Sequence, residues 1–219
     1  MEIFLPADVI LAIDFVAVLL GIFLPVIKKA NFDTSVVNFP HLLERFQLLV
    51  IMTFGEAIVT VAPFFNIQKF SIEPLLLFLI LISLFGSYAI QTEYMIEHHR
   101  KTRGTILMYA HFFIVISLNL LVTGVSLLLE IEGSSWQMKA IVALSVVIFL
   151  ISFQANNHYV KEKNLLSRKD INWLWLSIFF GGVLFLFSES HFMILLGILL
   201  ITTTNFLVKL NHLKSASSV

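Results

Sequence analysis

Long apolar stretches dominate this chain, and short polar segments separate them. A helix that crosses the hydrocarbon core of a bilayer needs about 20 apolar residues. Seven stretches reach roughly that length: Ala7–Ile27, Leu43–Phe65, Ile72–Thr92, Gly104–Leu129, Met138–Asn156, Ile171–Phe187 and His191–Lys209. Hydrocarbon offers no partner to free backbone groups, so we expect each stretch to be a helix. The pattern predicts an all-α, polytopic membrane helix bundle of about seven transmembrane helices, forming one domain over residues 1–219.

Basic residues in the connections predict the orientation of this bundle. Twelve of the 14 lysines and arginines flank the first, third and fifth connections or lie at the C-terminal end, and only Lys69 and Lys139 lie elsewhere. Connections rich in lysine and arginine stay on the cytoplasmic side. The N-terminus is then outside and the C-terminus inside, as an odd number of spans requires.

Composition supports the same environment. Hydrophobic residues make up 58% of the chain and charged residues 13%, whereas soluble domains carry about 25% charged residues. We therefore expect a lipid bilayer as the surroundings and a multi-pass protein of the cell membrane. Zero net charge gives no basic field for nucleic acid, and the lack of cysteine excludes thiolate metal sites. We expect no metal and no cofactor.

Glu56 is the most informative polar residue, because it lies deep inside the second predicted span. It follows Glu44 by twelve residues, which is roughly 18 Å of helix. A charged acid near the bilayer centre costs about 2.5–3.5 kcal/mol on insertion scales. A partner, a hydrated cavity or protonation has to offset that cost. Glu56 therefore either lines a proton or ion path, or binds a polar ligand, or is a structural carboxyl bonded to a neighbouring helix. Small Gly55 and Ala57 beside it favour a helix enclosed by the bundle.

Asp14 and His111 are two further candidates for the path inside predicted spans. Asp14 lies seven residues into the first span, at a depth similar to that of Glu56. The two acids would share a proton or bind a cation if their helices were adjacent; the alternative is that they face different neighbours. His111 in the fourth span suits a proton relay, or a core histidine bonded to a neighbouring carbonyl or hydroxyl.

The remaining polar residues favour structural roles. We interpret Thr202–Asn205 as packing, Asn119 and Gln154 as bonds between helices, and Gly181–Gly182 as a close helix contact. Glu97–Arg100 has the composition of a metal tract, but its charged surroundings favour a solvated loop.

A motif runs through the second span over HLLERFQLLVIMTFGEAIV, residues 41–59. Its residues are His41, Glu44, Arg45, Phe46 and Leu48, followed by Gly55, Glu56, Ala57, Ile58 and Val59. This run resembles the signature of the bacterial low temperature requirement protein A family, H-x-x-E-R-F-G-L with a downstream L-G-E-[SA]-I-V. Gln47 stands where the family usually has glycine, and Phe54 where it has leucine. Tyr109 and His111 are similar to the family's Y-x-H element.

The resemblance implies an integral membrane protein and carries no reaction or substrate. Its motifs cover about residues 40–125. Family members are usually longer, with additional spans before the signature, so the chain resembles their C-terminal portion.

Three functions fit these residues. The first is transport of a small solute, an ion or protons, with Glu56, Asp14 and His111 along the path. The second is a membrane enzyme acting on a lipid or lipid-linked substrate, in which His41, Glu44, Arg45 and His111 supply acid, base and phosphate contacts. The third is a non-catalytic scaffold, as a homo-oligomer or with a partner membrane protein. The motifs of metalloproteases, serine hydrolases and nucleotide-binding proteins are absent from the sequence, so transport is favoured over an enzyme.

Overall fold

The computed structural model describes residues 37–65, 71–130 and 136–217 and, before them, residues 9, 10, 13, 14, 16, 17, 20, 21 and 24. The chain forms two compact units, one of Met1–Val37 with Lys101–Arg103 and one of Asn38–Arg100 with Gly104–Val219. The described residues of the first predicted span are helical, and the rest of that span lies outside the described residues. The count of seven spans, the single domain and the orientation of the termini therefore stay predictions.

The second unit is a helix bundle. Its α-helices are α2 (Phe39–Val61), α3 (Glu73–Ala89), α4 (Thr105–Glu130), α5 (Trp136–Ala155), α6 (Arg168–Phe187) and α7 (His191–Ser217). Within the described residues, six helices are long and apolar enough to cross a membrane. They confirm the second to seventh predicted stretches, with ends that differ by a few residues and by eight at the end of α7.

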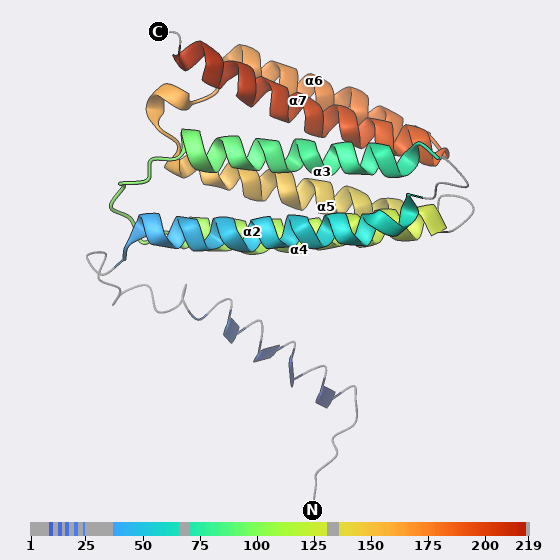
Figure 1. Cartoon of the computed structure of the whole chain (residues 1–219), viewed down its shortest axis with the longest axis horizontal. Coiled ribbons are helices and arrows are strands. Elements are labelled where there is room, and N and C mark those ends of the chain that lie inside the picture. Colours follow the sequence, from blue (N-terminus) through green and yellow to red (C-terminus); the bar gives the residue numbers. More distant parts are fainter. Residues whose placement is uncertain are drawn as a thin grey trace, which may run out of the picture. The chain divides into compact units, whose positions relative to one another are not determined.

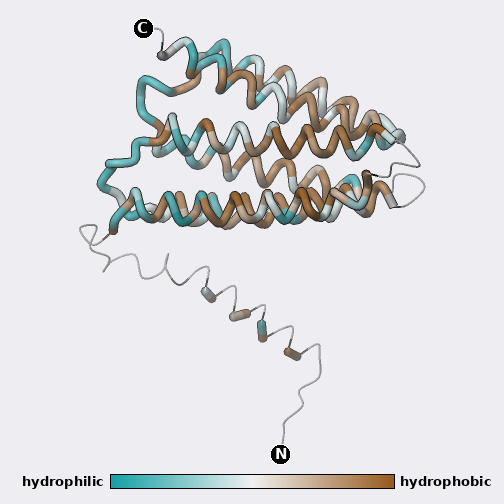
Figure 2. Tube along the Cα trace, in the orientation of Figure 1, coloured by the Kyte–Doolittle hydropathy of each residue, from teal (hydrophilic) through white to brown (hydrophobic). Residues whose placement is uncertain are grey.

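The helices alternate in direction and pack side by side (Figure 1). Helix α2 packs against α3 and α4, α4 against α5, α3 against α7, and α7 against α6. Two apolar clusters lie between them, a large one along the helices and a smaller one that includes Phe39, Ile96 and Tyr159. Hydrophilic residues gather at the end where α3, α5 and α7 finish (Figure 2). We call this the basic end, because Arg45, Arg100, Lys161 and Arg168 lie on the segments there.

Local sequence fixes where several helices begin and end. The Asn38 side chain accepts from the backbone of His41 at the start of α2, which satisfies a free N–H group of the first turn. Ser167 and Asp170 form a reciprocal capping box at the start of α6. Helix α3 continues into a π-helix, η3 (Ile90–Met95), a rare form that is frequent at functional sites.

The connection after η3 is tied to the end of α5. A short 3-10 helix, η4 (Asn156–Tyr159), follows α5, and Ile96 forms an isolated antiparallel bridge with Val160. The Arg100 guanidinium donates to the His158 carbonyl and lies over the Tyr159 ring. The predicted solvated loop over Glu97–Arg100 is therefore only partly solvated, because two elements hold it.

Glycines bring α6 and α7 into backbone contact. A Cβ placed on Gly181 would lie 2.5 Å from the Gly197 carbonyl oxygen, and one placed on Gly197 would lie 2.5 Å from the Gly181 oxygen. A Cβ on Gly182 would meet nothing within 4 Å. The predicted close contact is therefore confirmed for Gly181 and not for Gly182.

Two predicted bonds between helices are local bonds instead. Asn119 donates to the Val115 carbonyl of its own helix at 3.0 Å, and Gln154 accepts from Asn157 three residues on. Both amides lie within reach of backbone or side-chain groups one turn away, so they need no partner on a second helix.

The polar run in α7 combines local and interhelical bonds. Thr202 donates to the Ile198 carbonyl of its own turn at 3.1 Å. The hydroxyls of Thr203 and Ser83 pair α7 with α3 at 3.1 Å. The interpretation of this run as packing is thus confirmed for these two threonines.

Candidate functional site

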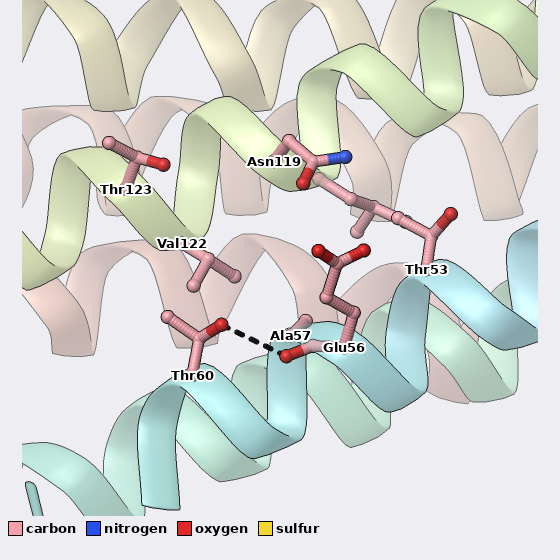
Figure 3. A pocket seen from close by; sticks show the side chains of 8 residues that line it. Thr53, Glu56, Ala57, Thr60, Asn119, Val122 and Thr123 are labelled. Atoms are coloured by element: carbon pink, nitrogen blue, oxygen red, sulfur yellow. Dashed lines mark hydrogen bonds between the residues drawn. The ribbon is translucent and has the colours of Figure 1, made fainter. Parts of the chain in front are cut away.

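Glu56 lines a small pocket between α2 and α4. Figure 3 shows the Glu56 side chain extending from α2 toward α4, where Asn119 lies. The pocket is lined by Thr53, Glu56, Ala57 and Thr60 of α2 and by Leu118, Asn119, Val122 and Thr123 of α4. Its volume of about 40 Å³ is enough for a few water molecules or one small ion.

The pocket presents oxygen acceptors. Thr53 donates its hydroxyl proton to the Leu49 carbonyl at 2.9 Å, and Thr60 donates to the backbone carbonyl of Glu56 at 3.0 Å. Asn119 uses an amide proton in its bond to Val115, so its carbonyl oxygen remains an acceptor. The hydroxyl protons of Thr53 and Thr60 are engaged, so their free lone pairs, together with the Glu56 carboxylate, suit a cation better than an anion.

The Glu56 carboxylate has no salt-bridge partner in the part of the chain that the structure describes. Eight residues separate it from Phe64, the last residue of the 3-10 turn that ends this span, which is roughly 12 Å of helix. Glu56 is exposed at the open side of the pocket within the six-helix unit.

Helix α2 is not enclosed on all sides within this unit. Its buried residues, including Val50, Phe54 and Ala57, form one face against α3 and α4. Met52 and Val59 are exposed on the other side, and a Cβ on Gly55 would meet nothing within 4 Å. The expectation that Gly55 permits a close helix contact is therefore wrong within the unit, where Ala57 lies in the contact instead.

His111 lies apart from the pocket and is fully buried, at 0% exposure. Its Nδ1 is 2.8 Å from the Leu107 carbonyl, and its Nε2 is 2.9 Å from the Tyr88 hydroxyl. A carbonyl only accepts, so Nδ1 carries a proton, and in the neutral ring Nε2 accepts from Tyr88. Both ring nitrogens are thus occupied, as the core interpretation of His111 expects. No sequence pattern indicated Tyr88 as its partner.

The motif residues His41, Glu44 and Arg45 lie on exposed first turns of α2, and Tyr109 lies on α4. His41 Nδ1 and a Glu44 carboxylate oxygen are 3.4 Å apart, and both side chains are about 70% exposed. Arg45 is exposed and Tyr109 is half-buried. Gln47, which replaces the family's usual glycine, donates to the Glu93 carboxylate of η3 at 2.9 Å. That bond links α2 to the π-helix and was not predictable from the motif.

Asp14 is helical and belongs to the other unit. Its pairing with Glu56 stays a prediction. Among the described residues, no group of three histidine or acidic side chains could hold a metal ion.

The family model of the bacterial low temperature requirement A protein matches residues 1–210 of the 219. The chain belongs to this family. The match extends beyond the motif-bearing residues 40–125 and includes the first predicted span and most of α7. No curated protein and no solved structure matches. The low temperature requirement A family and the six apolar helices together make the chain a multi-pass membrane protein.

Proposed function

We propose that the protein transports a small monovalent cation, or protons, across the cell membrane with the Glu56 carboxylate as the binding group. The observation that carries this proposal is a carboxylate without an ion-pair partner in a polar pocket of α2 and α4. An ionisable side chain inside a membrane span is costly and usually functional.

The ligands around Glu56 favour a monovalent ion over a divalent one. The pocket offers one carboxylate, together with the neutral oxygens of Thr53, Thr60, Asn119 and Thr123. One negative charge is neutralised by one monovalent cation or one proton, and sites for divalent ions usually add further carboxylates. We also propose Asp14 as a candidate residue of the transport path, because it lies inside the first predicted span.

The alternative of a membrane enzyme has less support. His111 was its main acid–base candidate, and both of its ring nitrogens are engaged inside the core. His41, Glu44 and Arg45 lie on exposed turns of α2 where they suit anchoring at the interface. A non-catalytic scaffold would show no ion flux, so a flux measurement distinguishes it from a transporter.

The test is ion flux in proteoliposomes that contain the purified wild-type protein, Glu56→Gln or Glu56→Asp. Gradients of H⁺, Na⁺ and K⁺ are imposed in turn, and flux is read with ion-sensitive dyes inside the vesicles. We expect wild-type flux of one of these cations. Glu56→Gln removes the charge and keeps the shape, so its flux should fall to that of empty vesicles, while Glu56→Asp should keep part of it.

Glu73→Gln is the matched control, because Glu73 is an acid in the first turn of α3 and does not line the pocket. Its flux should equal that of the wild type. Equal flux in Glu56→Gln and wild type, or no wild-type flux of any of the three cations, would refute the proposal. A loss of assembly in Glu56→Gln without any wild-type flux would favour the scaffold.

A further inference from the structure

Lys209 is a buried lysine on α7 with no hydrogen-bond partner. It is the last residue of the seventh predicted stretch, yet its side chain is only 1% exposed. Its amino group lies 3.3 Å from the centroid of the Phe153 ring of α5. A cation–π contact offsets only part of the cost of removing an ammonium from water. Polar groups are therefore expected around it.

Unpaired polar atoms are concentrated around this lysine. Among the described residues, seven buried side-chain atoms have no hydrogen-bond partner, and six of them lie toward the basic end of the bundle. They are Gln91 Oε1, both amide atoms of Asn156, Asn205 Oδ1, Lys209 Nζ and His212 Nε2. In native proteins such atoms are nearly always paired, often with internal water. Their concentration at one place marks a site.

These residues come from three elements that meet. Asn205, Lys209 and His212 are spaced by four and three residues, so they share one face of α7. Asn156 follows Phe153 by three residues, which places it one turn further along from the ring below Lys209. Gln91 of η3 donates to Asn157 of η4 at 2.7 Å, and η3 also packs against α7.

The mix of free donors and acceptors indicates what the site binds. Lys209 offers donors only, while Gln91 and Asn205 each offer an unpaired oxygen. No hydrogen bond joins Lys209 to either of them, so a molecule that both donates and accepts has to connect them. An anion would leave the amide oxygens unpaired, and a cation would leave the N–H groups of Lys209 unpaired.

We propose that Lys209, Asn205, Asn156 and Gln91 form an internal water-binding site at the basic end of the bundle, with the Lys209 amino group at its centre. Asn205 and His212 are seven residues apart on α7, so the unpaired atoms of this helix extend over roughly 10 Å. His212 lies about one turn beyond Lys209 on α7 and donates to Asp170 of α6 at 3.1 Å. The site lies apart from Glu56 and does not depend on the transport proposal.

Radiolytic hydroxyl-radical labelling of the intact protein tests this site. Radicals formed from bound water oxidise the side chains beside that water, and mass spectrometry locates the oxidation. Phe153 and Phe149 are a matched pair, since both are buried phenylalanines of α5 with their rings stacked 5.6 Å apart. Phe153 lies under Lys209, so we expect it to be oxidised several-fold faster than Phe149.

Lys209→Met identifies the group that holds the water. In this variant the oxidation of Phe153 should fall to the level of Phe149. Lys139→Met is the control. Lys139 is also a buried lysine, but it lies on α5 and donates to the Ser188 carbonyl at the opposite end of the bundle. Its replacement should leave the Phe153 rate unchanged. Equal protection of Phe153 and Phe149 in the wild type would overturn the proposal. An unchanged Phe153 rate in Lys209→Met would do so as well, and if that variant does not fold, the wild-type ratio decides.

Discussion

Replacing Gly181 with alanine is expected to force α6 and α7 apart and to lower the apparent melting temperature of the purified protein by roughly 5 °C. The new Cβ would lie 2.5 Å from the Gly197 carbonyl oxygen and 2.6 Å from a side-chain carbon of Ile201. A backbone oxygen cannot turn away as a side chain does, so the two helices have to separate. In a membrane the cost is lost close packing, which is a main force between helices there. Thermal unfolding in detergent measures the effect.

Gly182→Ala is the internal control for this experiment. Gly182 follows Gly181 directly, yet a Cβ there would meet nothing within 4 Å. Alanine also favours a helix over glycine by about 1 kcal/mol, so this variant should be as stable as the wild type or slightly more stable. Gly197→Ala should be as damaging as Gly181→Ala, because its Cβ would meet the Gly181 oxygen. Equal melting temperatures for Gly181→Ala and Gly182→Ala would contradict the packing of α6 on α7.

Much of the fold was predictable because lipid restricts what a segment can be. Apolar length alone identified α2 to α7, since a stretch of about 20 apolar residues has to become a helix in hydrocarbon. The π-helix over Ile90–Met95 was not predictable. Its residues, IQTEYM, carry no helix-breaking signal, and the widened turn depends on contacts with α7 and η4 that are distant in sequence.

The candidate site was predictable on one helix only. Glu56 stood out because an acid inside an apolar span needs an explanation. Asn119 and Thr123 complete the pocket from α4, but hydropathy does not encode which helices are neighbours. The same limit hid the partnership of Tyr88 with His111 across α3 and α4.

The burial of Lys209 was not predictable. A lysine near the end of an apolar stretch usually extends to the interface, and the sequence placed this one only among the basic residues of the cytoplasmic side. Helix α7 continues to Ser217, eight residues beyond that stretch, and neighbouring elements cover the lysine. Sequence periodicity did not reveal that continuation, because the added turns are polar.

Replacing His111 with alanine is expected to cost about 3 kcal/mol of folding free energy, among the largest effects of any single change in the bundle. The substitution leaves a cavity where the ring packs 5.2 Å from Phe46, and it leaves the buried Tyr88 hydroxyl without its partner. Tyr88→Phe removes only the hydroxyl, so its cost should be about 1 kcal/mol, as is usual for hydrogen bonds between membrane helices. Unfolding by sodium dodecyl sulfate in mixed micelles gives both values. Phe113→Ala, at an exposed position of the same helix, should cost much less than His111→Ala.

The double variant separates a structural histidine from a proton relay. In Tyr88→Phe with His111→Ala no polar atom of the pair remains unpaired, so the double loss should be smaller than the sum of the single losses by about 1 kcal/mol. A structural His111 also predicts that flux in His111→Ala declines only as the folded fraction declines. Additive losses would mean that the two side chains do not support each other. If His111→Ala loses flux while the protein stays fully folded, His111 belongs to the transport path. A proton relay fails when its proton-accepting nitrogen is removed, even though the helices remain in place.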